Sequence, residues 1–299
     1  MATITVAGAT GNMGGRIVRA LLDRGAYVRA LIRAESAGAR TDELENLGVE
    51  VVPVDLADPV GLARGCAGAD CVVSALQGLR GVIVAAQANL LDAAVEAGVP
   101  RFIPSDYSAD YTKCPEGSNR NLDLRREFGR RLDGAPIRGT SVLNGAFADM
   151  LLWGQVILRL AERRVEYWAD ADQPLDFTTM DDTASATAAA ALDPAAPRLL
   201  RVAGDQISAR GLADAATEVT GTPFELTHLG DLADLAGIIA RERAGDPATE
   251  GDLFPRWQAA QYLHNMFGGC GKLDPVENGR YPDIRWTTAR DVIARASGR

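Results

Sequence analysis

The sequence predicts an α/β fold, a doubly wound parallel sheet with a smaller lobe toward the C-terminus. Two observations predict it. Short apolar segments alternate with helical segments through the first half of the chain, and this alternation loosens after about residue 150. Strands joined through helices form right-handed crossovers, and repeated crossovers build a parallel sheet with helices on both faces.

The elements of the first half follow from their residue patterns. Residues 2–7 are apolar and rich in β-branched side chains, which is typical of a buried parallel strand. Residues 15–25 place Ile17 and Leu21 on one helical face. The same patterns predict strands at 26–33, 49–58, 69–78 and 99–108, and helices at 41–48, 58–68 and 81–98.

The second half is predicted to be mainly helical. Residues 150–162, 209–221 and 232–245 have helical patterns, and residues 172–193 combine a short strand, a capped turn and an alanine-rich helix. Because single cores stop growing near roughly 250–300 residues, a chain of 299 residues is expected to carry a second, smaller lobe.

Composition and charge exclude several classes of partner. Forty acidic and 31 basic residues give a net charge of −9, so the chain offers no basic surface to nucleic-acid phosphates or anionic membranes. No stretch approaches the roughly 20 apolar residues of a spanning helix, and no basic segment precedes the apolar start as in a signal peptide. We expect a cytoplasmic monomer or homodimer without nucleic-acid or membrane partners.

Cysteine and histidine usage predicts no metal site. The cysteines have no metal-type spacing, and the two histidines lie far apart in the sequence. We expect the cysteines to be thiols, as in cytoplasmic proteins. The cysteines are Cys66, Cys71, Cys114 and Cys270, and the histidines are His228 and His264.

A glycine loop, GATGNMG, joins the first strand to the first helix. Gly8 permits a tight turn, Gly11 lets the backbone approach a pyrophosphate, and Gly14 permits close packing of helix on strand. A plain tight turn in an unliganded α/β fold is the alternative, but the position between strand and helix favours dinucleotide binding at the helix start. The expected contact residues of the loop are Gly8, Thr10, Gly11, Asn12, Met13 and Gly14.

The choice of cofactor depends on the end of the second strand. A NAD site places an acidic residue there for the ribose 2′-hydroxyl, whereas this chain has Arg33. A guanidinium fits a 2′-phosphate and offers the hydroxyl no acceptor. Glu35 lies close by, and Arg33 as a solvated surface charge is the other interpretation. We expect NADP(H).

Two more strand ends are expected to face the cofactor, because ligands of open parallel sheets bind outside the carboxyl ends of the strands. The third strand end is expected to contact the adenine, and the fourth to line the middle of the cofactor. Ordinary turn chemistry at a strand end is the alternative for each. The residues are Asp55 and Leu56 for the third strand, and Ala75, Leu76 and Gln77 for the fourth.

Three stretches together resemble the NmrA-like, isoflavone-reductase-like group of atypical short-chain dehydrogenases. They are GATGNMG, VPRFIPSDYS at 99–108, and HNMFGGCGKLDPVENGRYPDIRWTTARDVI at 264–293. The resemblance implies an NADPH-binding Rossmann domain with a small C-terminal substrate lobe. It implies either reduction of small aromatic or carbonyl compounds or cofactor sensing without turnover. It also implies that residues near the nicotinamide include Pro104, Ser105, Asp106 and Tyr107, and Asn144 to Phe147.

The proton donor for such a reduction is harder to predict. Ordinary short-chain dehydrogenases use Tyr-x-x-x-Lys, but Tyr111 follows Tyr107 at that spacing and Pro115 follows Tyr111. The group that the chain resembles has a lysine on the helix after the fifth strand, and residues 119–128 contain none. The candidates are Tyr107, Tyr111, Lys113 and His264, for each of which a structural role is the alternative.

The leading hypothesis is an NADP-dependent oxidoreductase that reduces a small aromatic or polyketide-like carbonyl or enone compound. Residues 1–150 would form the dinucleotide-binding domain, and residues 151–299 a partly interleaved substrate-binding lobe in which about 176–203 return to the sheet. A non-catalytic NADP(H) sensor with a protein partner is the first alternative. An isomerase or cyclase that retains the cofactor is the second.

Overall fold

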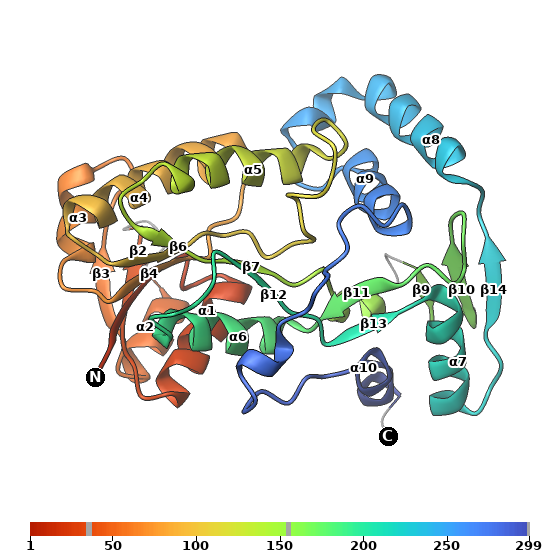
Figure 1. The fold of residues 1–299 in the computed structure, drawn as a ribbon, viewed down its shortest axis with the longest axis horizontal. Coiled ribbons are helices and arrows are strands. Elements are labelled where there is room, and N and C mark those ends of the chain that lie inside the picture. The colour runs from red at the N-terminus through yellow and green to blue at the C-terminus, as the bar shows by residue number, and fades with distance from the viewer. Residues whose placement is uncertain (34–37, 154–156, 298–299) are drawn as a thin grey trace. The chain divides into compact units, whose positions relative to one another are not determined.

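The computed structural model describes residues 1–33, 38–153 and 157–297, and the chain forms two compact units (Figure 1). The first unit contains Met1–Tyr107, Leu124–Val142 and Thr183–Leu200. The second contains Ser108–Asp123, Leu143–Asp182 and Arg201–Arg299, so the two units exchange segments along the sequence. A cofactor-binding role for the first and a substrate-binding role for the second stay predictions.

The regular elements have the following bounds. The α-helices are α1 (Asn12–Asp23), α2 (Ala39–Asn46), α3 (Pro59–Cys66), α4 (Gln87–Glu96), α5 (Arg120–Asp133), α6 (Met180–Leu192), α7 (Ala209–Thr220), α8 (Leu232–Gly245), α9 (Arg256–Phe267) and α10 (Ala289–Ala296). The strands are β1 (Thr3–Ala7), β2 (Tyr27–Ile32), β3 (Glu50–Pro53), β4 (Cys71–Ser74), β5 (Arg101–Ile103), β6 (Arg138–Gly139), β7 (Ser141–Leu143), β8 (Ala146–Phe147), β9 (Leu158–Arg159), β10 (Arg164–Tyr167), β11 (Leu175–Thr178), β12 (Leu199–Arg201), β13 (Asp205–Ile207) and β14 (Glu225–His228).

The first unit is built on a parallel sheet with the order β3-β2-β1-β4-β5-β6 among the described residues. Figure 1 shows α3, α4 and α5 on one face of this sheet and α1 and α6 on the other. Because helices cover both faces of the sheet, side chains on both faces of a central strand are buried, as in β4, where all four residues are buried. The chain therefore has the doubly wound α/β fold that the sequence predicts.

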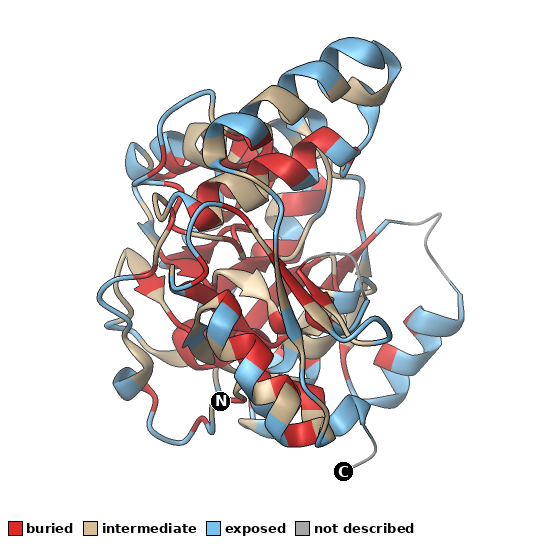
Figure 2. Ribbon diagram, turned by 90° about the vertical axis from the view of Figure 1, so that its right-hand side faces the viewer, coloured by how far each residue is buried: buried red, intermediate tan, exposed pale blue. Residues whose placement is uncertain are grey.

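Apolar periodicity explains how the helices of the first unit pack. Helix α1 buries Gly14, Ile17, Val18 and Leu21, which follow the helical repeat. Figure 2 faces the end of Figure 1 that carries α7, α8 and α10, and it shows helices along which buried and exposed residues alternate. Helix α1 therefore covers the sheet with an apolar stripe and presents polar side chains to solvent, whereas α6 is buried at most of its positions.

The second unit has two small sheets, ordered β14-β10-β9 and β13-β11-β8 among the described residues. Its core includes the fully buried side chains of Leu158, Val165 and Phe177. Strands β7 and β12 pair with each other near the points where the sequence passes between the units. This unit is therefore a mixed α/β body with its own core.

The helix predicted over 150–162 is wrong. A short 3₁₀ helix covers Ala148–Trp153, and residues 158–159 form strand β9. Leu158 pairs with Val165 of β10, and both side chains are fully buried. The apolar side chains at 157 and 158 thus enter the core from a strand, which an apolar pattern over so few residues does not distinguish from a helix.

In the described ranges, no helix is long and apolar enough to cross a membrane. Within the same ranges, no group of three or more histidine, cysteine, aspartate or glutamate side chains could hold a metal ion.

Candidate functional site

The carboxyl ends of β1 and β4 lie side by side in the first unit. The Ala75 amide donates to the Ala7 carbonyl at 2.8 Å, directly after the two strands. From β1 the chain moves through β2 to β3, and then crosses to β4 on the other side of β1. This is the point at which the strand order reverses, and ligands of open α/β sheets bind outside the strands at such a point.

The glycine loop occupies that position and depends on close backbone contacts. Gly8 has a φ of 83°, and a β-carbon there would lie 2.6 Å from the Ala75 carbonyl oxygen. A β-carbon on Gly14 would collide with the Gly8 carbonyl and lie 3.0 Å from the Ala9 Cα. Because all of these neighbours are backbone atoms, a side chain at either position would force the turn to open.

Helix α1 starts directly beyond this turn without a side-chain cap. Its N-cap residue is Gly11, and Gly11 and Asn12 are exposed. The Asn12 carboxamide instead accepts from Arg16 Nε at 3.0 Å. Thr10 and Met13 are half-buried beside the turn. The amide groups of the first helical turn are thus available to an anion, which the helix dipole also favours.

Two arginines stand near the glycine loop. Arg33 is exposed directly after β2, and its contact with a 2′-phosphate stays a prediction. Glu35, the competing acidic residue, lies outside the described residues. Sequence reasoning missed Arg40, on α2, whose guanidinium donates to the Thr10 carbonyl. The sequence does show Arg40 as a second basic residue shortly after Arg33, and this proximity could have identified it as a candidate.

The other strand ends mix exposed and half-buried side chains. Asp55 is exposed, and its carboxylate accepts from the Ala57 amide at 2.8 Å, a local turn. Leu56, Ala75 and Leu76 are half-buried, and Gln77 is exposed. The first unit therefore gathers these predicted residues at the carboxyl edge of its sheet, and contact with the cofactor stays a prediction.

Ser105 connects two of the predicted strand ends. Its hydroxyl donates to the Leu76 carbonyl at 2.7 Å, and its amide donates to Gln87 Oε1 at 2.8 Å. Pro104 is buried beside it. The ends of β4 and β5 are thus held together by a buried hydrogen-bond network, which keeps this edge of the sheet in a fixed shape.

Tyr107 has an unusual backbone conformation, and a hydrogen bond fixes its side chain. Its φ is 26°, an unfavourable value for a residue with a side chain, and its hydroxyl donates to the Ser74 carbonyl at 3.2 Å. Burial raises the pKa of the phenol far above its ordinary value, although a hydrogen bond with Thr187 opposes this. A phenol that holds its proton this firmly is a poor acid, so the geometry counts against proton donation by Tyr107.

The other three candidates belong to the second unit. Lys113 Nζ donates to the Lys272 carbonyl at 3.1 Å and to the Asp274 carbonyl at 2.8 Å. Tyr111 is 2% exposed, and His264 is half-buried on α9. The lysine thus ties its loop to the segment after α9, and all three catalytic roles stay predictions.

Asn144 of the second unit is a buried carboxamide without partners. The residue is fully buried, and neither Nδ2 nor Oδ1 has a hydrogen-bond partner within the described structure. Phe147, on β8, is half-buried and pairs with Thr178 of β11. Buried polar groups are nearly always hydrogen-bonded, and contact of the Asn144 carboxamide with the cofactor stays a prediction.

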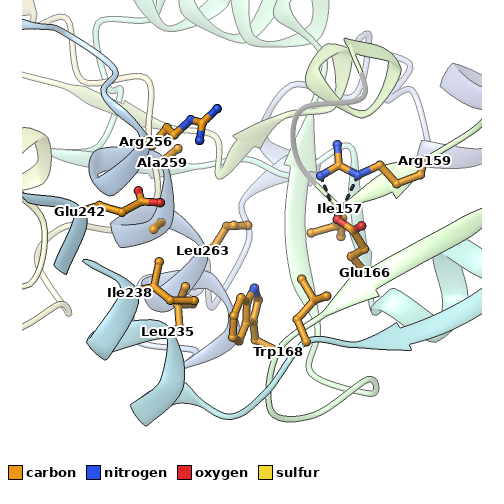
Figure 3. A pocket seen from close by; sticks show the side chains of 12 residues that line it. Ile157, Arg159, Glu166, Trp168, Leu235, Ile238, Glu242, Arg256, Ala259 and Leu263 are labelled. Atoms are coloured by element: carbon orange, nitrogen blue, oxygen red, sulfur yellow. Dashed lines mark hydrogen bonds and ion pairs between the residues drawn. The ribbon is translucent and has the colours of Figure 1, made fainter. Parts of the chain in front are cut away.

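A pocket of about 230 Å³ lies within the second unit, lined from β9, β10, α8 and α9 (Figure 3). Apolar side chains such as Trp168 and Leu235 form much of its wall. Figure 3 shows Arg159 and Glu166 together on one side, where Arg159 Nη2 and Glu166 Oε2 are 2.8 Å apart. Further charged side chains at this pocket are Glu242 and Arg256. An apolar wall with a few charges is typical of pockets for small organic molecules.

The carboxylate of Glu166 is expected to make the second unit acid-sensitive. Burial alone would raise its pKa, but hydrogen bonds from Arg159 and Arg164 outweigh burial and lower it. A carboxylate with a lowered folded-state pKa stabilises the fold above its ordinary pKa of about 4.5, and this stability is lost as the pH falls through the folded-state value. Denaturation followed between pH 6 and pH 3 should therefore depend less on pH in Glu166→Gln. An identical pH dependence in both proteins would contradict this.

The family comparison agrees with these features. The model of the NmrA-like family matches residues 1–277. The chain belongs to the NmrA-like family. The resemblance found in the sequence is thereby confirmed, and the glycine loop and the sheet described above are those of an NmrA-like protein.

Curated relatives of this NmrA-like chain are plant reductases. It is 27% identical to pinoresinol reductase 1 of Arabidopsis thaliana, over 97% of this chain and 95% of the relative. It is 26% identical to a bifunctional pinoresinol-lariciresinol reductase of Linum album, over 98% and 93%. The similarity therefore extends along nearly the whole of each chain.

Solved structures have the same fold. AtPrR2 with NADP⁺ and (+)pinoresinol aligns with a TM-score of 0.82 at 21% identity, covering 99% of this chain and 98% of that one. The complex of leucoanthocyanidin reductase with NADPH, from Vitis vinifera, aligns with a TM-score of 0.83 at 18% identity, covering 100% of both. At these identities the likeness establishes the fold of the NmrA-like chain, and the predicted α/β fold is confirmed.

Proposed function

We propose that this chain is an NADP-dependent oxidoreductase that reduces a small aromatic or polyketide-like carbonyl or enone compound by hydride transfer. The observation that carries the proposal is the glycine loop at the point where the strand order reverses. Backbone contacts require glycine at positions 8 and 14 there, and helix α1 begins without a side-chain cap. The reductase relatives support the class of reaction and an aromatic substrate.

The first unit fits NADP(H) in its chemistry. Helix α1 begins at Asn12 without a side-chain cap, which leaves the amide groups of its first turn to a pyrophosphate, and no side chain at Gly8 or Gly14 obstructs the approach. Arg33 and Arg40 supply guanidinium groups for the 2′-phosphate that distinguishes NADP from NAD. The neighbours solved with NADP⁺ and NADPH support the same choice.

The protein must orient the substrate and provide a proton, since bound NADPH supplies the hydride. The Tyr107 hydroxyl donates a hydrogen bond to a backbone carbonyl, and the Lys113 ammonium group donates to two more. Histidine is the side chain that most readily transfers protons near neutral pH. We therefore propose His264, a half-buried residue of α9, or the buried Tyr111 as the proton donor.

The test begins with calorimetric titration of NADPH, NADP⁺ and NADH into the purified protein. NADPH and NADP⁺ are expected to bind at least about tenfold more tightly than NADH, a difference of about 1.4 kcal/mol. Oxidation of NADPH is then followed with simple aryl ketones and aryl enones, and separately with pinoresinol, an ether that the names of the relatives suggest. Failure of every dinucleotide to bind at millimolar concentration would overturn the proposal.

Replacing Arg40 by alanine is expected to weaken NADPH binding by about tenfold or more and to leave NADH binding nearly unchanged. A charge-assisted hydrogen bond to a phosphate contributes about 1.5–3 kcal/mol, and NADH lacks that phosphate. Arg19→Ala is the matched control, because Arg19 forms an ion pair with Glu43 between α1 and α2. Two results would show that Arg40 does not bind the 2′-phosphate. One is an equal loss of NADPH affinity in both variants, and the other is an equal loss of NADPH and NADH affinity in Arg40→Ala.

Replacing Asn144 by leucine, which has a similar volume, tests the unpartnered carboxamide. An unsatisfied buried polar group costs about 1–3 kcal/mol, so the ligand-free variant is expected to be at least as stable as the wild type. NADPH should bind the variant several-fold more weakly. Thermal unfolding with and without NADPH measures both effects. A large loss of stability without the cofactor would instead indicate that water satisfies the carboxamide.

A cofactor sensor without turnover is the second candidate function. The observation that favours it is that residues 119–128 contain no lysine, while the ammonium group of Lys113 is held by backbone carbonyls. A sensor is expected to discriminate strongly between NADPH and NADP⁺ and to oxidise NADPH with none of the substrates. The titration and the turnover assay together separate the two functions.

A further inference from the structure

Two cysteines far apart in the sequence meet in the second unit. The Sγ atoms of Cys114 and Cys270 are 2.6 Å apart, although 156 positions separate the residues. Cys114 lies in the loop before α5, and Cys270 lies in the segment after α9. Both are present as thiols. The pair is therefore already within the range at which a small movement would join the sulfurs, since a disulfide bond is about 2.0 Å long.

Contacts other than the sulfurs hold the two segments in place. The Asp110 amide donates to the Gly271 carbonyl at 2.9 Å, and Lys113 Nζ donates to carbonyls at 272 and 274. A β-carbon on Gly271 would lie 2.9 Å from the Ala109 Cβ and 3.3 Å from the Cys114 Sγ. The close approach of the thiols is thus part of a packed contact between two backbone segments.

The surroundings of Cys270 favour its thiolate. The Cys114 thiol and the Asn265 carboxamide, at 3.2 Å, hydrogen-bond to its sulfur. The hydrogen bond with Cys114 is the main cause that lowers the pKa of Cys270 to about 7, and Asn265 adds to it while burial opposes it. Cys270 is half-buried and Cys114 is 5% exposed. The thiolate is the reactive form of cysteine, so Cys270 is the more reactive of the two.

The two remaining cysteines provide an internal contrast. Cys66 and Cys71 lie in the core of the first unit, and both are fully buried. Burial raises the pKa of Cys66 to about 11 and that of Cys71 to about 12. Their thiols are thus kept protonated and shielded, as structural cysteines are.

We propose that Cys114 and Cys270 are a redox-active dithiol that a peroxide converts to a disulfide. The Cys270 thiolate attacks one peroxide oxygen, the O–O bond breaks, and hydroxide leaves, which produces a sulfenic acid on Cys270. The Cys114 thiolate then attacks that sulfur, the S–O bond breaks, and a second hydroxide leaves. With the two thiol protons, the products are one disulfide and two water molecules, so the dithiol loses two electrons and hydrogen peroxide gains them.

The disulfide would tie the loop of Tyr111 and Lys113 to the segment that follows α9, the helix of His264. A covalent link across so long a loop restricts the unfolded chain, so the oxidised protein is expected to unfold at a higher temperature than the reduced one. The chemistry of the pair is independent of the proposed reductase activity, and its test needs neither cofactor nor substrate.

The experiment treats the full-length protein with hydrogen peroxide, blocks remaining thiols with an alkylating agent, and maps the peptides by mass spectrometry. The expected product has lost two hydrogen atoms and contains a cross-linked pair of peptides bearing Cys114 and Cys270. Cys270 should react at least about tenfold faster than Cys66 and Cys71, which are alkylated only after denaturation. In Cys114→Ser, the sulfenic acid on Cys270 should persist and react with dimedone.

Three results would overturn the proposal. The first is oxidation of Cys66 or Cys71 at the same rate as Cys270. The second is formation of sulfinic acid on Cys270 of the wild-type protein without a cross-link to Cys114. The third is no reaction at a peroxide concentration that oxidises free cysteine in the same tube. The wild-type peptide map decides between these results even if a serine variant does not fold.

Discussion

Gly14→Ala is expected to reduce NADPH affinity at least about a hundredfold, which is about 2.8 kcal/mol. The added β-carbon would lie 2.7 Å from the Gly8 carbonyl carbon and 3.0 Å from the Ala9 Cα. Neither backbone atom can move without opening the turn between β1 and α1, which is the pyrophosphate site that we propose. Overpacking of this kind also costs about 1–3 kcal/mol of stability. Calorimetry and thermal unfolding measure the two effects.

The neighbouring glycine is a matched control for this experiment. A β-carbon on Gly15 would find only the Ala9 carbonyl oxygen, at 3.5 Å, which is an ordinary contact distance. Alanine is also the better helix former, by about 1 kcal/mol, so Gly15→Ala should be as stable as the wild type or more so, and should still bind NADPH. If both variants bound NADPH as the wild type does, the loop would not be the pyrophosphate site.

Asp110→Ala is expected to destabilise the second unit by about 3–5 kcal/mol. The Asp110 side chain is fully buried, and its Oδ2 lies 2.7 Å from Arg201 Nε. Its other oxygen accepts from the Thr112 amide at 3.1 Å and from the Thr112 hydroxyl at 2.5 Å. Removal of the carboxylate leaves a largely buried guanidinium without this partner, which costs more than the pair itself contributes.

Tryptophan fluorescence during urea denaturation measures this loss selectively, because the second unit contains all four tryptophans of the chain. Asp172→Ala is the control, since Asp172 forms an ion pair with Arg210 in which both side chains are more than half exposed. That variant should unfold near the wild-type urea concentration, because exposed pairs contribute little. Equal midpoints for Asp110→Ala and the wild type would contradict the assigned role of the Asp110–Arg201 pair.

Local patterns predicted the first unit well. The apolar segment before Gly8 and the helical repeat of Ile17 and Leu21 are properties of short stretches, and the sheet and α1 form as expected from them. The spacing of Gly8, Gly11 and Gly14 likewise identified the loop, in which Gly8 has a positive φ and Gly14 lies against the Gly8 carbonyl. Segment 150–162 was misjudged, since the choice between helix and strand there depends on pairing with β10.

Side-chain roles at the site depended on contacts that no local pattern contains. Lys113 is a charged residue of a polar loop in the sequence, whereas in the fold its ammonium is bound by carbonyls about 160 positions away. Tyr107 is a plausible acid in the sequence, whereas in the fold its hydroxyl donates to the end of β4. Arg40 became a candidate only through its contact with Thr10.

The sequence alone thus specified the strands, the first helices and the glycine loop. They are predicted by side-chain repeats of two or 3.6 residues and by the spacing of glycines, and both patterns are visible within short segments. The partners of Asp110 and Cys270 follow from packing, which brings together residues that lie dozens to more than a hundred positions apart, and packing also buries the Asn144 carboxamide. Burial, hydrogen bonding and reactivity are properties of such assembled surroundings, and they arise only when each unit folds as a whole.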